Sequence, residues 1–174
     1  MLKTSGSAPD RDKEASMGTR YAKLGPGEGP NYDWENDHTF VKVSGQDTGG
    51  AYTLMEDNLK SSFALGLHRH DTHAETFYFL EGEVDFYVDG DWHRCTQGTT
   101  MHVPPGVPHA CRVANNAPAR MLMIFQPSGF DGFLAELATM TEADFADEAK
   151  MAELNSRYDI IPMGPVPAHP DDTV

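Results

Sequence analysis

The feature that most limits the choice of fold is a series of short apolar segments between about residues 38 and 127. The segments read HTFVKV, AYTLMED, SSFALGLHRH, ETFYFLEGEVDFYVDGDWHRC, TTMHVPPGVPHACRVA and ARMLMIFQP. Turn sequences such as GQDTGG, EG, DG, QG, PPG and NNAP interrupt them, and such sequences favour reversals of the chain. Because no helical period lies between the segments, we expect at least eight strands in an antiparallel sandwich or barrel.

The two flanking segments differ from this β-rich part. Residues 1–36 are polar and rich in glycine and proline, so we expect a flexible N-terminal arm. Beyond about residue 129 the apolar period becomes helical, first in FDGFLAELATM and then in TEADFADEAKMAELNSRY, where Thr141 is the expected N-cap. The expected domains are therefore an arm at 1–36, a barrel at 37–128, and an extension at 129–174 with two helices and a Pro-rich tail.

The charge and hydropathy of the 174 residues exclude several classes of partner. Asp and Glu number 27 against 13 Lys and Arg, so the formal charge is -14, and we expect neither nucleic acid nor a membrane as partner. No apolar run reaches the ~18 residues of a membrane span, and the first residues lack the apolar core of a signal peptide. We therefore expect a cytoplasmic protein in which Cys95 and Cys111 are buried, reduced thiols.

Side chains that can bind a metal gather in the stretch HRHDTHAETFYFLEG, which begins at His68. His68 and His70 are two residues apart, so both imidazoles project from one face of a strand. A hairpin at the polar segment DTHA would bring Glu75 alongside them. A second stretch, GTTMHVPPGVPHACRV, places a tight Pro-Gly turn just before a strand that starts at His109. Three imidazoles and one carboxylate suit a divalent Fe, Mn, Co, Ni, Cu or Zn ion.

These two stretches resemble the two motifs of the cupin superfamily. The first motif reads HxH, three or four residues, Glu, six residues, Gly; the second reads Gly, five residues, Pro, any residue, Gly, two residues, His. Both are matched at every step, at His68, His70, Glu75 and Gly82 and at Gly98, Pro104, Gly106 and His109. The chain departs from the family at Ser62, where the family has glycine, and at Val113, where asparagine is frequent. Neither of these is a ligand position.

The resemblance covers roughly residues 38–127 and implies a single-domain, all-β cupin (double-stranded β-helix, or jelly-roll) barrel with a metal inside. It implies one divalent transition metal ion per chain, held by His68, His70, Glu75 and His109, with Glu75 also serving as general base. The C-terminal stretch LNSRYDIIPMGPVP resembles quercetin-dioxygenase-like cupins, which implies a dioxygenase that acts on an aromatic or enolic small molecule. Two alternatives stay open: a lyase, isomerase or polyketide cyclase that uses the metal without oxygen, and a non-catalytic cupin that binds a small ligand.

Two further expectations concern residues beside the motifs. His73 has the wrong spacing for the motif, so we expect it at the surface or at the pocket rim, with a ligand or proton-relay role as the alternative. If the two motif histidines of this strand point inward, alternation places Phe63, Leu65 and Leu67 outside, where large apolar side chains mark an interface. The C-terminal helices or a second subunit can cover that face. Cupins commonly form dimers in this way, so we expect a homodimer.

Overall fold

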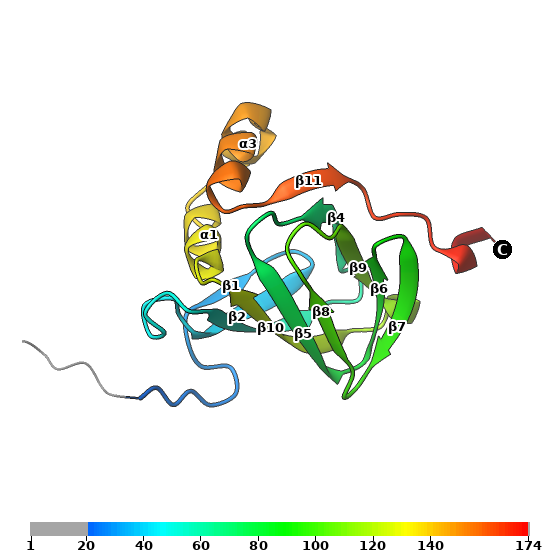
Figure 1. The fold of residues 1–174 in the computed structure, drawn as a ribbon, viewed down its shortest axis with the longest axis horizontal. Helices are drawn as coiled ribbons and strands as arrows, with labels where there is room; N and C mark the ends of the chain where they lie inside the picture. Colours follow the sequence, from blue (N-terminus) through cyan, green and yellow to red (C-terminus); the bar gives the residue numbers. More distant parts are fainter. Residues whose placement is uncertain (1–20, 174) are drawn as a thin grey trace, which may run out of the picture.

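The computed structural model describes residues 21–173, and the flexibility expected for residues 1–20 lies outside that part. The strands form two antiparallel sheets around a common interior (Figure 1). The first sheet has the order β1-β2-β3-β10-β5-β8, with bounds Asn31–Asp33, Asp37–Val43, Thr53–Leu59, Ala119–Gln126, Ala74–Glu81 and Thr100–Val103. The second has the order β11-β4-β9-β6-β7, with bounds Ile161–Gly164, Ala64–Arg69, His109–Val113, Glu83–Val88 and Asp91–Thr96. This architecture confirms the predicted all-β jelly-roll fold.

The inner faces of the two sheets carry one apolar core. On β3 and β10 buried residues alternate with more accessible ones, which is the two-residue period expected of strands with one face inside. The largest fully buried apolar side chains in the core cluster are Phe77, Phe79, Phe86, Phe125, Met55, Leu59 and Met121. Each such side chain contributes about 1.5–3 kcal/mol by leaving water. The thiols of Cys95 and Cys111 are buried and unpaired, as expected.

The C-terminal extension forms three helices where the sequence predicted two. Helix α1 spans Phe130–Leu137, α2 Glu142–Ala146 and α3 Glu148–Arg157. Thr141 caps α2 as predicted. The second predicted helix breaks at Asp147, whose backbone is extended and whose carboxylate accepts hydrogen bonds from the first amides of α3. None of the helices in the described residues has the length and apolar content needed to cross a bilayer.

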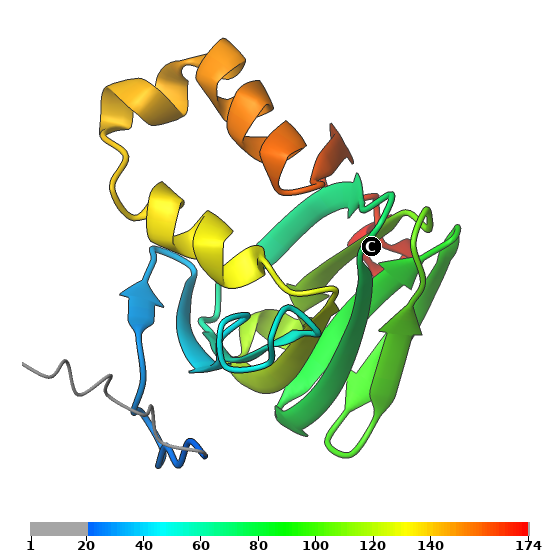
Figure 2. The same cartoon turned by 60° about the vertical axis from the view of Figure 1, so that its left-hand side comes forward.

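The extension returns to the barrel and joins its second sheet. Figure 2 shows α1, α2 and α3 at one end of the molecule, with the chain then running back along the sheet. There β11 pairs antiparallel with β4, so that Pro162 lies opposite His68. Two short 3-10 helices, Ala114–Asn116 and Pro170–Thr173, complete the regular structure of the described residues. A segment outside the β-rich motifs therefore borders the strand that carries the first histidines.

The predicted outward face of β4 is only partly correct, because the strand contains a β-bulge. Leu65 pairs with Cys111 and His68 pairs with His109, so β4 has one residue more than β9 between these pairs. The extra residue reverses the alternation and turns Leu65 to the same face as His68. Phe63 is buried in the core cluster, and Leu65 and Leu67 line an interior cavity. Leu65 is nevertheless 40% exposed, so part of the expected apolar surface remains accessible, and the homodimer stays a prediction.

Part of the predicted arm adds a strand to its own chain. β1 pairs antiparallel with β2, with Asn31 opposite Phe40. The Asn31 side-chain oxygen lies 3.0 Å from Nε2 of His38. The rings of Tyr32 and Trp34 stack with their centroids 6.1 Å apart. Residues 31–33 therefore extend the edge of the first sheet within the protomer.

We predict that Gly82→Ala lowers the free energy of unfolding by about 3 kcal/mol or more. Gly82 has φ +73, and a Cβ there would lie 2.6 Å from the Pro118 carbonyl oxygen and 2.8 Å from Cα of Ala119. Left-handed backbone costs a substituted residue about 1–2 kcal/mol, and overpacking adds about 1–3 kcal/mol. Gly106→Ala is the control, because Gly106 has φ +84 but nothing within 4 Å of its Cβ position. Urea unfolding measures both, and equal losses would contradict the predicted clash.

Candidate metal centre

Strands from both sheets position the four motif residues. His68 lies near the end of β4, His70 follows that strand, and His109 begins β9, directly opposite His68. Glu75 is the second residue of β5, which belongs to the other sheet. The expected hairpin between His70 and Glu75 is therefore wrong, because residues 70–73 cross from one sheet to the other. Glu75 contacts the histidines across the space between the two sheets. It does not lie on a strand that pairs with theirs.

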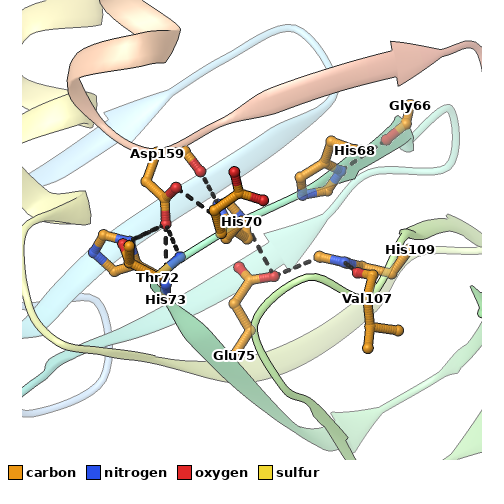
Figure 3. A network of polar contacts seen from close by, with 10 residues as sticks. Gly66, His68, His70, Thr72, His73, Glu75, Val107, His109 and Asp159 are labelled. Atoms are coloured by element: carbon orange, nitrogen blue, oxygen red, sulfur yellow. Dashed lines mark hydrogen bonds and ion pairs between the residues drawn. The ribbon is translucent and has the colours of Figure 1, made fainter.

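The structure brings these four side chains into one buried cluster (Figure 3). One nitrogen or oxygen from each lies within 4.8 Å of all the others. Oε2 of Glu75 is 2.5 Å from Nε2 of His109 and 3.4 Å from Nε2 of His70. All four residues are at most 9% exposed. We call His68, His70, Glu75 and His109 the His-Glu cluster.

Backbone carbonyls fix the orientation of each imidazole in the His-Glu cluster. The Nδ1 atom of every ring lies within hydrogen-bond distance of a carbonyl oxygen: that of Gly66 for His68 at 2.9 Å, Val107 for His109 at 3.1 Å and Asp159 for His70 at 2.7 Å. A proton on Nδ1 donates to that carbonyl and leaves the Nε2 lone pair of the neutral ring free. This is the tautomer that a metal-binding histidine needs.

The electrostatics of the cluster keep Glu75 ionised and His68 neutral. Burial, followed by the neighbouring His109, lowers the pKa of His68 to about 4. Burial alone would raise the pKa of Glu75, but its contacts with His109 and with His70 outweigh burial and bring that pKa to about 2. For His70, burial acts to lower the pKa and the Glu75 carboxylate, 3.4 Å from Nε2, raises it, with a net rise. At neutral pH the cluster thus presents a carboxylate and at least one neutral imidazole.

The donor atoms of the His-Glu cluster fit a divalent cation. Nε2 of His70 is buried and has no hydrogen-bond partner, which is costly unless a ligand satisfies it. The set consists of imidazole nitrogens and one carboxylate, with no sulfur, and such a set suits borderline metals. The cluster can therefore hold one transition metal ion through His68, His70, Glu75 and His109.

Asp159 lies between α3 and β11 and holds the crossing segment beside the cluster through hydrogen bonds. No sequence motif predicted this role. Its carboxylate accepts hydrogen bonds from the backbone amides of Asp71 (2.9 Å), Thr72 (2.8 Å) and His73 (2.9 Å), and from the Thr72 hydroxyl (2.7 Å). Its carbonyl is the acceptor for the ring of His70. Asp159 itself has φ +58. Its only sequence signal is an acid directly after a predicted helix, which does not reveal the partners.

His73 lies outside the His-Glu cluster. Its Nδ1 atom is 2.8 Å from Oδ2 of Asp159, and its side chain is only 14% exposed. It is absent from the residues that line the large interior cavity. This placement agrees with the expectation that His73 is not a ligand. It does not agree with the expected surface or rim position, because Asp159 holds the His73 ring against the crossing segment.

A cavity of about 410 Å³ opens beside the cluster. His68, His70 and Glu75 reach it from one side. Most of its wall is apolar, with six aromatic side chains: Trp34, Phe63, Phe77, Phe125, Phe130 and Phe133. Part of this wall comes from helix α1 and from Ile160, the residue that directly precedes β11 in the sequence. The cavity has the size and lining of a small-molecule site.

Comparison with known proteins adds a family match to this geometry. Residues 59–125 match the family model described as "Cupin domain". Quercetin 2,3-dioxygenase from Bacillus subtilis is 27% identical over 100 residues, which are 58% of this chain and 29% of that protein. An uncharacterised protein of Methanocaldococcus jannaschii is 33% identical over 61 residues, which are 35% of this chain and 49% of that one. The aligned part thus spans less than half of either relative.

Solved structures share the fold at low sequence identity. The polyketide cyclase RemF from Streptomyces resistomycificus has a TM-score of 0.56 at 15% identity, covering 62% of this chain and 80% of that one. An RmlC-like cupin from Shewanella frigidimarina has a TM-score of 0.54 at 19% identity, covering 63% and 93%. These similarities support the two-sheet architecture alone.

We predict that Asp159→Ala lowers the free energy of unfolding by about 2–4 kcal/mol at pH 7, because three backbone amides and a hydroxyl lose a charged acceptor. Hydrogen bonds from Thr72 and His73 hold the pKa of Asp159 well below its usual value, although burial acts to raise it. The stabilisation is therefore complete above the unfolded pKa near 3.8 and disappears as pH falls through the lower folded pKa. Denaturant unfolding of both proteins between pH 7 and pH 2 should show the gap closing below about pH 4.

The control is Asp71→Ala in the same crossing segment. The Asp71 carboxylate is 54% exposed and pairs with Arg69, and such surface pairs contribute about 0–1 kcal/mol. Hydrogen exchange at the amides of Thr72 and His73 should accelerate only in the Asp159 variant. Equal destabilisation by the two substitutions would contradict the role assigned to Asp159.

Proposed function

We propose that this protein is a metal-dependent cupin enzyme whose divalent transition metal ion is held by His68, His70, Glu75 and His109. The match of residues 59–125 to the cupin family model supports this proposal. The observation that carries the proposal is the convergence of three imidazoles and a carboxylate in a buried space that adjoins the cavity. An unpartnered His70 Nε2 atom at that point is costly in a protein without a ligand there.

We propose further that the reaction is a dioxygenation of an aromatic or enolic small molecule. Two observations support this choice: the aromatic wall of the cavity, and the sequence relationship to the quercetin 2,3-dioxygenase of Bacillus subtilis. When bound, a divalent ion supplies Lewis acidity and lowers the pKa of a coordinated substrate hydroxyl.

The chain's own residues have three tasks in this scheme. The apolar wall excludes water and orients a flat substrate against the His-Glu cluster. The carbonyls of Gly66, Val107 and Asp159 keep the imidazoles in position. Glu75 is ionised at neutral pH, which is the state that a general base for the substrate hydroxyl requires.

Loss of a single ligand tests the metal centre. We predict that His68→Ala and His109→Ala each lower metal affinity by at least ~10- to 100-fold. Loss of a residue that only supports a ligand costs that much, so loss of a ligand should cost no less. The matched control is His73→Ala, because His73 lies in the same region but bonds to Asp159 instead of the cluster. Elemental analysis of protein purified without an affinity tag measures the outcome. Full occupancy in the His109 variant would overturn the assignment.

Metal removal gives an independent prediction about stability. A ligand present at a hundredfold excess over its Kd stabilises the folded state by about 2.7 kcal/mol. For a chain of this size, chelation should lower the melting temperature by about 5–10 °C, while the apolar core keeps the stripped protein folded. The His109→Ala protein is the control, since it has little metal to lose. Identical melting curves before and after verified metal removal from the wild type would contradict the prediction.

Oxygen uptake separates dioxygenation from the oxygen-independent alternatives. An oxygen electrode records consumption when the metal-loaded protein is mixed with enolic aromatic compounds such as flavonols. We expect uptake that Glu75→Gln abolishes. Turnover of the compound without oxygen uptake would instead indicate a lyase, isomerase or cyclase.

A further inference from the structure

A carboxyl group on the inner face of the first sheet is unexplained by the metal centre. Asp57 lies on β3 between the buried Met55 and Leu59, and it is only 2% exposed. Its cross-strand neighbour on β10 is the buried Met121. An acid in an apolar sheet face lowers stability unless it is satisfied, so such groups often belong to functional sites.

A second acid faces Asp57 from the adjacent strand. Thr39 is directly opposite Asp57, and its hydroxyl donates to Oδ1 of Asp57 over 3.1 Å. Asp37 lies two residues before Thr39 and therefore on the same face of β2. Both acids line the large cavity. We call Asp37 and Asp57 the distal acid pair.

Burial and the nearness of two acids favour a protonated carboxyl group in the distal acid pair. Burial, followed by the charge of Asp37, raises the pKa of Asp57 to about 7. Burial also raises the pKa of Asp37, while the nearby Lys60 acts to lower it. Two adjacent carboxyl groups with one proton offer both a hydrogen-bond donor and an acceptor. The pair can therefore bind a hydroxyl or carbonyl oxygen.

The distal acid pair and the His-Glu cluster are two polar ends of one apolar cavity. Strand β10 lies between Asp57 on β3 and Glu75 on β5. Asp57 is opposite Met121 of β10 and Glu75 is opposite Phe125, four residues further along that strand. This corresponds to roughly 16 Å between Cα atoms on a flat sheet. At the other end His70 directs a buried, unpartnered Nε2 atom toward the same space. That atom belongs to the His-Glu cluster, so it supports a ligand or metal ion at this end of the cavity only.

The charges around the cavity narrow the class of ligand. No Lys or Arg is among the described residues that line it, whereas Asp37, Asp57 and Glu75 are. A free anion would meet uncompensated negative charge away from the metal site. The aromatic wall instead favours a flat, uncharged body.

From this arrangement we infer that the cavity binds a neutral aromatic ligand with oxygens at both ends, one at the His-Glu cluster and one hydrogen-bonded to the distal acid pair. Asp57 and Asp37 thereby select ligands with a distal hydroxyl or carbonyl and fix which end reaches the cluster. The inference rests on the proposed metal centre for the first contact, while the second contact depends only on the acid pair.

The experiment compares two probes that differ in one hydroxyl. Naphthalene-2,3-diol carries a chelating diol at one end, and naphthalene-2,3,6-triol adds a hydroxyl at the other end. Calorimetry with full-length, Zn²⁺-loaded protein should show at least ~10-fold tighter binding of the triol. The diol leaves the distal acid pair without a hydrogen-bond partner, and this lowers its affinity. We expect Asp57→Leu and Asp37→Leu to reduce this preference to less than about twofold, with the affinity for the diol unchanged.

Two controls separate a specific contact from a change in shape. Asp57→Asn keeps polar atoms at the same place and should retain part of the preference. Asp33→Leu makes the same change on the neighbouring β1, where the carboxylate is 64% exposed and bonds Lys60, and should leave the preference intact. If Asp57→Leu does not fold, the more accessible Asp37→Leu decides the outcome.

The possible outcomes distinguish this inference from the proposed function. Equal affinity of the wild type for both probes, or a preference that survives in both leucine variants, overturns the inference and leaves the metal centre untouched. Failure of both probes to bind also overturns it. If the wild type takes up no metal, the proposed function is overturned. If this metal-free protein still prefers the triol, and Asp57→Leu removes the preference, the distal contact is still supported.

Discussion

The contact between Glu75 and the histidines opposite it is the interaction on which the rest of the structure depends. Glu75 comes from one sheet, while His68 and His109 come from the other, so their contact joins the two sheets inside the core. A carboxylate buried at 3% exposure is stable there only if charged or donating partners surround it. The backbone carbonyls that aim the imidazoles and the segment that crosses between the sheets all serve that requirement.

The C-terminal extension is part of this arrangement, although it lies outside the family match at 59–125. Asp159 holds the crossing segment and the ring of His70. Helix α1 covers the cavity with Phe130 and Phe133, whose rings pack in series with Phe125 of β10. The extension therefore contributes a supporting residue to the cluster and a wall to the cavity. A shortened chain without it would lose both, even with every motif residue present.

Stability and function compete on the inner face of the first sheet. Apolar residues at Asp57 and Glu75 would pack with the surrounding Met and Phe side chains at a lower desolvation cost. Proteins tolerate such costs at sites where a ligand satisfies the polar groups. The remaining apolar core, which includes four fully buried phenylalanines, is large enough to fold the barrel around two polar ends.

The sequence by itself determined the strand series and the four residues of the His-Glu cluster, because these follow from short apolar segments between turn signals and from local motif spacing. A two-residue period placed Asp57 in phase with Met55 and Leu59, so the sequence already contained the signal for a buried acid. Only the tertiary structure decided which sheet each strand joins, and this is why β4 and β5 face each other instead of forming a hairpin. It also decided the bulge that places Leu65 on the cavity side of its strand, and the approach of Asp159 to residues almost ninety positions earlier. Bulges and long-range contacts depend on how strands pair across the whole chain, and a local pattern carries no information about that pairing.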